Sequence, residues 1–154
     1  MKIAIYSRGI ENNQHQDIVR LLDELALSGV EVVFYQDFFN QFYSAIDLKA
    51  KYSTFNSSKD LDQNIDFIIS LGGDGTLLDT VTLVKDSGIP VAGINYGRLG
   101  FLANIGKEDL VTAVEALVNR TFVLDQRTLI HLDANTSLFG DAPYALNEFT
   151  LHKK

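Results

Sequence analysis

The sequence Gly-Gly-Asp-Gly-Thr at residues 72–76 constrains the fold more than any other stretch of the chain. Residues 65–71, directly before it, are apolar and β-branched over the length of a buried strand. After it, apolar side chains recur at helical spacing as far as Gly88: Leu77, Leu78, Val81 and Val84. The sequence therefore predicts a tight turn that leads from a buried strand into a helix.

The residue types in this turn suit the binding of a phosphate. Glycines allow positive φ angles and let another molecule approach the backbone, and the start of the next helix offers free N–H groups to an anion. Asp74 would repel a phosphate unless it held a metal ion or accepted a proton. The structural alternative is that Asp74 caps the helix or stabilises the turn. The dinucleotide pattern Gly-x-Gly-x-x-Gly fails at Leu78, and no Gly-Lys-Ser/Thr of a P-loop follows.

Strand and helix patterns alternate on both sides of this turn. The predicted strands are residues 3–6, 30–35, 65–71 and 89–94, and the predicted helices are 18–25, 38–46, 77–84 and 110–118. Such β-α-β units favour parallel pairing with right-handed crossovers. Residues 52–60 are rich in small polar side chains, mainly Ser, and are predicted to form a surface loop.

A second glycine-rich turn, residues 95–102, follows the predicted strand 89–94. Ligands of open parallel sheets bind beyond the carboxyl ends of the strands. We therefore expect the two glycine-rich turns to line one crevice.

From Phe122 the pattern changes to alternating strands. Two long strands are predicted, at 129–134 and 144–153, with a loop at 135–143 between them. We predict an α/β fold: an open parallel-sheet, Rossmann-like domain over residues 1–121, then the first strands of a β-rich domain over 122–154. Because the strand pattern continues to the last residue, we expect this second domain to be truncated.

Composition excludes several classes of function. The chain has 154 residues, 46% hydrophobic and 21% charged, as in ordinary globular proteins. Its net charge of −7 argues against a nucleic-acid or anionic-membrane binder. It contains no cysteine, and we see no signal peptide and no apolar run of membrane-spanning length. A cytoplasmic location is expected.

Three stretches, in this order and spacing, resemble the NAD kinase family: residues 72–76, the pattern Gly-Ile-Asn-x-Gly-x-Leu-Gly-Phe-Leu at 93–102, and Asn147-Glu148. The resemblance implies transfer of the terminal phosphate of ATP to the 2′-hydroxyl of the adenosine ribose of NAD, giving NADP. It also implies Mg²⁺ as a divalent cofactor and a homo-oligomer, dimer or tetramer, in the full-length protein. The family's β-rich second domain completes the NAD pocket and the assembly interface.

The resemblance also assigns roles to individual residues. Asp74 matches the acid proposed as general base towards the ribose hydroxyl; because a free carboxylate has a pKa of about 4, its value must come from positioning the alcohol. Phe101 resembles a wall of the adenine pocket, and Asn147 and Glu148 match a pair that hydrogen-bonds the adenosine. The phosphate loop would comprise Gly72, Gly73, Gly75 and Thr76, with Gly75 touching the nucleotide through its backbone. No residue is assigned to a metal.

Structural alternatives stand beside these roles. Phe101 and Asn95 could serve packing, with Asn95 tethering the second glycine-rich turn, and Glu148 could be a solvated strand carboxylate. Asp79 is acidic where some family members carry a cation; it could bind the magnesium of the nucleotide or stabilise the helix start.

Two other functions compete with NAD phosphorylation. One is a lipid or sugar kinase of the same superfamily. Lipid kinases of that group usually place Asn-Glu directly after the glycine turn, where this chain has Leu77-Leu78. The other is a non-catalytic nucleotide-binding module, since most of the second domain is missing.

Overall fold

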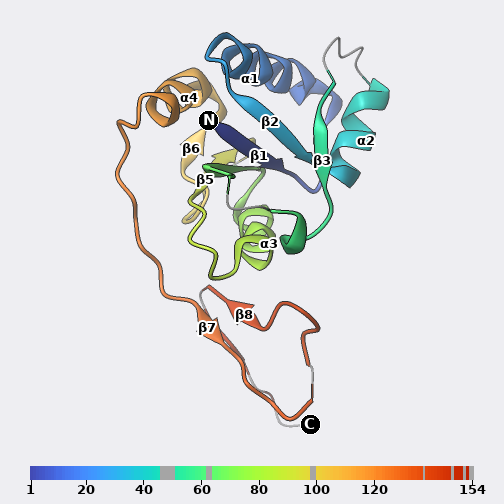
Figure 1. The fold of residues 1–154 in the computed structure, drawn as a ribbon, viewed down its shortest axis with the longest axis vertical. Helices are drawn as coiled ribbons and strands as arrows, with labels where there is room; N and C mark the ends of the chain where they lie inside the picture. Colours follow the sequence, from blue (N-terminus) through green and yellow to red (C-terminus); the bar gives the residue numbers. More distant parts are fainter. Residues whose placement is uncertain are drawn as a thin grey trace.

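A computed structural model describes residues 1–45, 51–61, 64–97, 100–136, 138–146, 148–150 and 152. The described residues form a six-stranded parallel sheet and a separate two-stranded antiparallel sheet (Figure 1). The strands are β1 Lys2–Tyr6, β2 Glu31–Tyr35, β3 Ser53–Phe55, β4 Phe67–Leu71, β5 Val91–Asn95, β6 Ile105–Gly106, β7 Ile130–His131 and β8 Tyr144–Ala145. The helices are α1 His15–Leu27, α2 Gln36–Ala45, α3 Asp74–Val84 and α4 Leu110–Val118, with short 3₁₀ turns η1 Asn12–Gln14, η2 Ser58–Asp60 and η3 Lys107–Asp109.

The strand order of the large sheet is β3-β2-β1-β4-β5-β6. This is the Rossmann order, in which the direction of winding reverses between the first and fourth strands. Here the reversal falls between β1 and β4, which pair in register from Ile3 opposite Phe67 to Tyr6 opposite Ser70. The predicted α/β, parallel-sheet fold is confirmed.

Side chains of β1 alternate between the two faces of the sheet, as the period of a strand requires. Ile3 and Ile5 belong to the core under α1, α2 and α4, whereas Ala4 and Tyr6 face the opposite side. Helix α3 covers that opposite side, where Leu77 and Val81 pack with Ala103 (Figure 1). Both faces are therefore covered, as a parallel sheet needs.

Two parts of the fold differ from the sequence prediction. The predicted surface loop 52–60 contains the edge strand β3, which pairs with β2 and buries Phe55. The strand was not predicted because most of the residues around Phe55 are polar. Strand β6, only two residues long, was also missed. Each joins the sheet by pairing with another strand, β3 with β2 and β6 with β5, which the composition of the segment itself does not indicate.

The prediction of two long strands after Phe122 is wrong within the described residues. Strands β7 and β8 have two residues each, with Ile130 opposite Ala145 and His131 opposite Tyr144. The ring of Phe122 packs edge-on against Phe67 of the large sheet, with centroids 5.1 Å apart. A two-stranded ribbon has little apolar surface of its own to bury and is marginal without further strands.

No helix within the described ranges is long and apolar enough to cross a membrane.

A substitution of Gly93 in β5 tests how tightly α3 packs on the sheet. A Cβ at this position would lie 2.7 Å from Leu77 Cδ1 and 3.0 Å from the Ala103 backbone. We expect Gly93→Ala to lower the free energy of unfolding by about 1–3 kcal/mol because the added methyl overpacks this contact. Urea denaturation measures the change. Gly97→Ala is the control, since a Cβ there meets, among the residues described, only Asn95 Oδ1, at 3.6 Å; equal stability of the two variants would contradict the packing.

Candidate functional site

The first glycine-rich turn is shaped by its backbone. Gly72 has a φ of +149°, a conformation that favours glycine, and a side chain on it would overlap the side chain of Thr76. The Gly72 N–H donates to the Ile94 carbonyl at 2.9 Å, which ties the end of β4 to β5. Thr76 is buried, and its side chain lies against Gly72 on the inner side of the turn.

Asp74, the first residue of α3, joins this turn to the second one. Its Oδ2 accepts a hydrogen bond from the Phe101 N–H at 2.9 Å, and its Oδ1 accepts from the N–H groups of Leu102 at 3.0 Å and Ala103 at 2.9 Å. We call the carboxylate and these three N–H groups the Asp74 latch. A side chain on Gly100 would overlap the carboxylate, so glycine is required for this close approach.

The Asp74 latch sets the chemistry of the carboxylate. Hydrogen bonds from the backbone of Ala103, Phe101 and Leu102 hold the pKa of Asp74 below its ordinary value of 3.8. Asp74 is therefore a charged acceptor and a weak base at neutral pH. A carboxylate has about four lone-pair positions, and the three N–H groups use most of them. The remaining capacity suits one hydroxyl donor from a ligand.

Asn95 supports the second turn from inside. Its side-chain Oδ1 accepts from the Gly97 N–H at 2.8 Å, and its Nδ2 donates to the Ala103 carbonyl at 3.2 Å. Only 3% of Asn95 is exposed. The prediction that Asn95 tethers this turn is confirmed, and the tether holds Ala103 where its N–H reaches Asp74.

The structure brings some of the predicted site residues together and leaves others apart. Phe101 meets Asp74 through its backbone, while its side chain is 97% exposed, so a packing role for that ring is wrong in the described part of the chain. Gly75 is exposed at the start of α3. Glu148 is exposed and makes no hydrogen bond or ion pair with the residues described, and Asn147 lies outside them.

The end of the chain nevertheless comes alongside α3. Leu146 packs against the cluster of Leu77, Val81 and Ala103, in which Leu77 follows the first glycine-rich turn and Ala103 follows the second. Two residues later the chain reaches Glu148. The ribbon formed by β7 and β8 thus lies next to the helix that begins at Asp74 (Figure 1).

Three residues at the end of β1, Tyr6, Ser7 and Arg8, were not identified as site residues from the sequence. The Ser7 hydroxyl, 1% exposed, donates to the Leu71 carbonyl at 2.8 Å and so connects the ends of β1 and β4. Arg8 forms a two-point ion pair with Asp79, with Nη2 2.7 Å from Oδ1 and Nε on Oδ2. The Tyr6 hydroxyl donates to the same Oδ2 at 3.1 Å. The available signal was their place after a central strand, where ligand sites of parallel sheets gather.

Asp79 is accordingly neither free for a metal nor a residue of the first helical turn. Its hydrogen bond with the Arg8 guanidinium, and the charge of that group, hold the pKa of Asp79 below its usual value against the opposing effect of burial. Burial, and then the negative charge of Asp79, raise the pKa of Tyr6. Tyr6 therefore remains a neutral hydrogen-bond donor at neutral pH.

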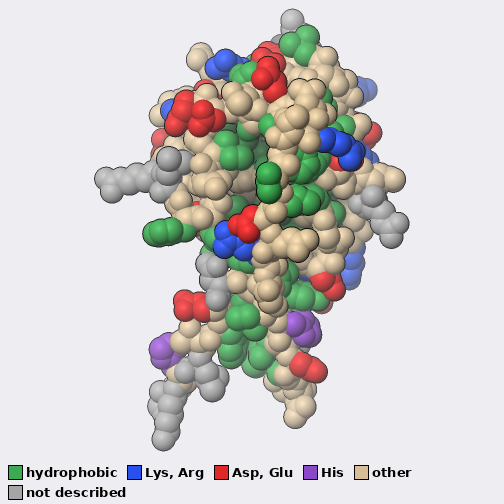
Figure 2. Space-filling model, turned by 90° about the vertical axis from the view of Figure 1, so that its left-hand side faces the viewer, with side chains coloured by type: hydrophobic (Ala, Val, Ile, Leu, Met, Phe, Trp, Pro, Cys, Tyr) green, Lys and Arg blue, Asp and Glu red, His purple; other side chains and the backbone are tan. Residues whose placement is uncertain are grey.

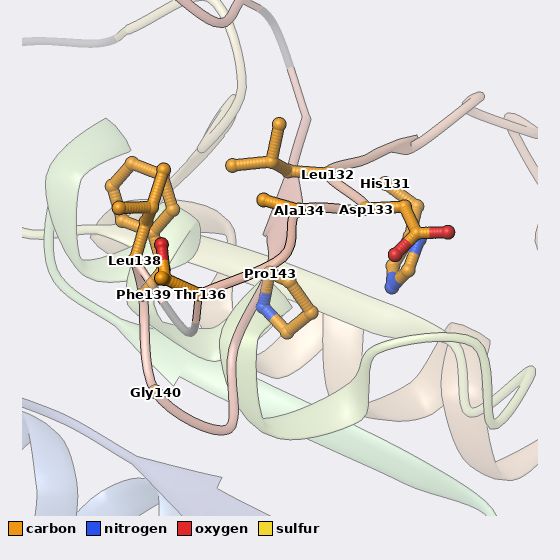
Figure 3. Close-up of a pocket in the computed structure, with 9 residues that line it drawn as sticks. All are labelled: His131, Leu132, Asp133, Ala134, Thr136, Leu138, Phe139, Gly140 and Pro143. Carbon is orange, nitrogen blue, oxygen red and sulfur yellow. The ribbon is translucent and has the colours of Figure 1, made fainter.

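No group of three or more His, Cys, Asp or Glu side chains that could hold a metal occurs among the residues described. The hairpin segment that carries β7 and β8 has a small pocket of its own. Figure 3 shows His131 and Asp133 on one side of it and Leu138 and Phe139 on the other. Figure 2 shows hydrophobic side chains gathered on the lower part of the molecule. The exposed hydrophobic residues of the hairpin segment include Ile130. None of the lining residues belongs to the two glycine-rich turns.

The fold and site define a Rossmann-like α/β domain with two glycine-rich loops joined at the carboxyl ends of its strands. A family model described as the ATP-NAD kinase N-terminal domain matches residues 7–122. The chain therefore belongs to the NAD kinase family.

Individual relatives agree with this family assignment. NAD kinase of Flavobacterium johnsoniae is 36% identical over all of this chain and 53% of its own length, and that of Bacteroides fragilis is 30% identical over all of this chain and 52% of its own. The crystal structure of yeast NADH kinase complexed with NADH shares the fold, with a TM-score of 0.70 and 19% identity over 94% of this chain and 46% of that one. The chain thus spans about half the length of the curated relatives.

Acid titration tests the Asp74 latch. Because the folded-state pKa of Asp74 lies below 3.8, the latch contributes its full stability above that pH and loses it as the pH falls through the folded-state pKa. We expect the Asp74 carboxyl carbon, followed by NMR, to titrate with a midpoint below 3.8. The amide protons of Phe101, Leu102 and Ala103 should shift with the same midpoint. A midpoint at or above the ordinary value, or amide shifts that ignore it, would contradict the latch.

Proposed function

We propose that this chain forms the first half of an ATP-dependent NAD kinase that phosphorylates the 2′-hydroxyl of the adenosine ribose, giving NADP. The observation that carries the proposal is the Asp74 latch: a charged acceptor with room for one hydroxyl, next to a glycine loop at the winding reversal of the sheet. The relatives named NAD kinase supply the substrate class.

In the proposed reaction the ribose 2′-oxygen forms a bond to the terminal phosphorus of ATP. The bond from that phosphorus to the bridging oxygen breaks, and ADP leaves. Asp74 accepts a hydrogen bond from the 2′-hydroxyl and holds its oxygen in line with the phosphate. Phosphoryl transfer has a loose transition state that relies on positioning, so a weakly basic carboxylate suffices and takes the hydroxyl proton late.

Magnesium enters this scheme as part of the substrate, bound to the phosphates of ATP. The carboxylates nearest the glycine loop already have partners, because backbone N–H groups hold Asp74 and Arg8 holds Asp79. Mg²⁺ commonly keeps several waters and binds through substrate phosphates with few protein ligands. This donor set fits such a metal better than a metal held by a protein cage.

The other sites follow from the same proposal. Gly72, Gly73, Gly75 and Thr76 would form the phosphate loop, Phe101 would cover the adenine, and Asn147 and Glu148 would bind the adenosine. We assign residues 1–121 to the nucleotide-binding domain and 122–154 to the start of a β-rich domain that completes the NAD pocket. Packing of Leu146 on α3 supports this arrangement, since it carries the chain towards the turns. Assembly into a dimer or tetramer and a cytoplasmic location stay predictions.

A coupled NADP-formation assay on the full-length protein, comprising this chain and the proposed second domain, tests the function. We expect turnover with ATP, Mg²⁺ and NAD, and little or none from the 154-residue chain alone. Asp74→Asn should lower kcat/KM by about 100-fold or more because it mispositions the alcohol.

Asp86→Asn is the matched control, since Asp86 is exposed in the turn after α3. It should keep normal activity. Binding of NAD and ATP by the full-length protein without any NADP formation would contradict the proposal and favour a non-catalytic nucleotide-binding module.

A further inference from the structure

We propose that Arg8 binds a phosphate group of the bound nucleotide, and that Asp79 and Tyr6 hold its guanidinium towards the phosphate loop. This inference rests on the proposed function, because it adds to that reaction a binding residue, Arg8, and two positioning residues.

Arg8 lies at the carboxyl end of β1, beside the first glycine-rich turn. Arg8 follows β1, one of the two strands at the winding reversal of the sheet. Tyr6, two residues earlier, pairs with Ser70 of β4, the strand that leads into the glycine loop. The Arg8 side chain crosses from the end of β1 to the start of α3, where it lies against Gly75. Two parallel strands thus deliver a cation and a glycine loop to the same edge of the sheet.

Asp79 fixes the orientation of the Arg8 guanidinium. Nε and Nη2 of Arg8 donate to the two oxygens of Asp79, which itself sits one turn into α3 and also accepts from Tyr6. Nη1 instead faces the loop, 3.3 Å from the position that a Cβ on Gly75 would occupy. The two-point contact fixes the plane of the guanidinium and leaves the edge that carries Nη1 beside the phosphate loop.

The Arg8 side chain is accessible from solvent. The Arg8 side chain is 59% exposed, so a ligand can reach it. Because Gly75 has no side chain, the guanidinium can lie against the loop backbone. Arginine is suited to phosphate oxygens because it offers several N–H donors in a rigid plane. Asp79 offsets the net charge of Arg8, so the proposed contact depends on directed hydrogen bonds.

The ion pair of Arg120 with Asp66 has a similar exposure to that of Arg8 with Asp79 but lies elsewhere in the fold. Arg120 pairs with Asp66 at 3.3 Å, with side-chain exposures of 69% and 29%, close to the 59% and 34% of Arg8 and Asp79. Asp66 precedes β4, so this pair lies at the amino end of the strand, away from the glycine loop. Surface ion pairs contribute little to stability. Arg120→Met is therefore a matched control for Arg8→Met.

The test measures nucleotide binding and turnover separately in the full-length protein. Isothermal titration with a non-hydrolysable ATP analogue and, in a second arm, with NAD gives the two Kd values; steady-state assays give KM and kcat. We expect Arg8→Met to raise one Kd and the matching KM by roughly 10-fold or more, the usual size of a lost charged hydrogen bond. The arm that changes shows whether the phosphate belongs to the donor or to NAD. Arg120→Met should change neither.

Two further variants keep the test decisive if Arg8→Met folds poorly. Arg8→Lys keeps the charge but lacks the rigid fork, and Asp79→Asn loosens the guanidinium; each should weaken binding of the same nucleotide while thermal melting shows a folded protein. Unchanged Kd and KM values for both nucleotides in folded Arg8 variants would overturn the inference, even when wild type makes NADP. If wild type makes no NADP but the Arg8 variants still bind a nucleotide more weakly, the proposed function fails and the phosphate contact stands.

Discussion

The site depends on one interaction: the Asp74 carboxylate accepts hydrogen bonds from three backbone N–H groups. It joins residues 27 to 29 positions apart in the chain and holds the loop after β5 against the start of α3. Several neighbouring features serve this contact. Gly100 leaves room for the carboxylate, Asn95 fixes the Ala103 carbonyl, and Gly93 lets α3 and Ala103 approach β5.

In the function that we propose, the same interaction explains how an acidic chain with a net charge of −7 would hold an anionic ligand. The loops would rely on backbone N–H groups and glycine, so few cations would be needed. Asp74 would oppose a phosphate if its charge were free, but the three N–H groups offset that charge and direct it. In our proposal Asp79 holds the Arg8 guanidinium in a fixed direction at this edge.

Much of this organisation could be predicted from the sequence, because it is encoded locally. The buried strand, glycine turn and helix around Asp74 are contiguous in the chain, and Asn95 tethers Gly97 and Ala103, which lie two and eight residues away. The partners of Asp74 and the pairing of Arg8 with Asp79, 71 residues apart, depend on how strands are ordered in the sheet. Likewise, the short strand β3 forms because β2 offers it an edge, and the ribbon of β7 and β8 is shorter than its alternating pattern indicated.

The most direct measurement is a crystal structure of the full-length protein with NAD bound. We expect an Asp74 oxygen within hydrogen-bond distance of the adenosine ribose 2′-hydroxyl, with the N–H groups of residues 101–103 still donating to the carboxylate. An adenosine ribose bound away from Asp74, or a carboxylate turned away from these N–H groups, would contradict the central role of this contact.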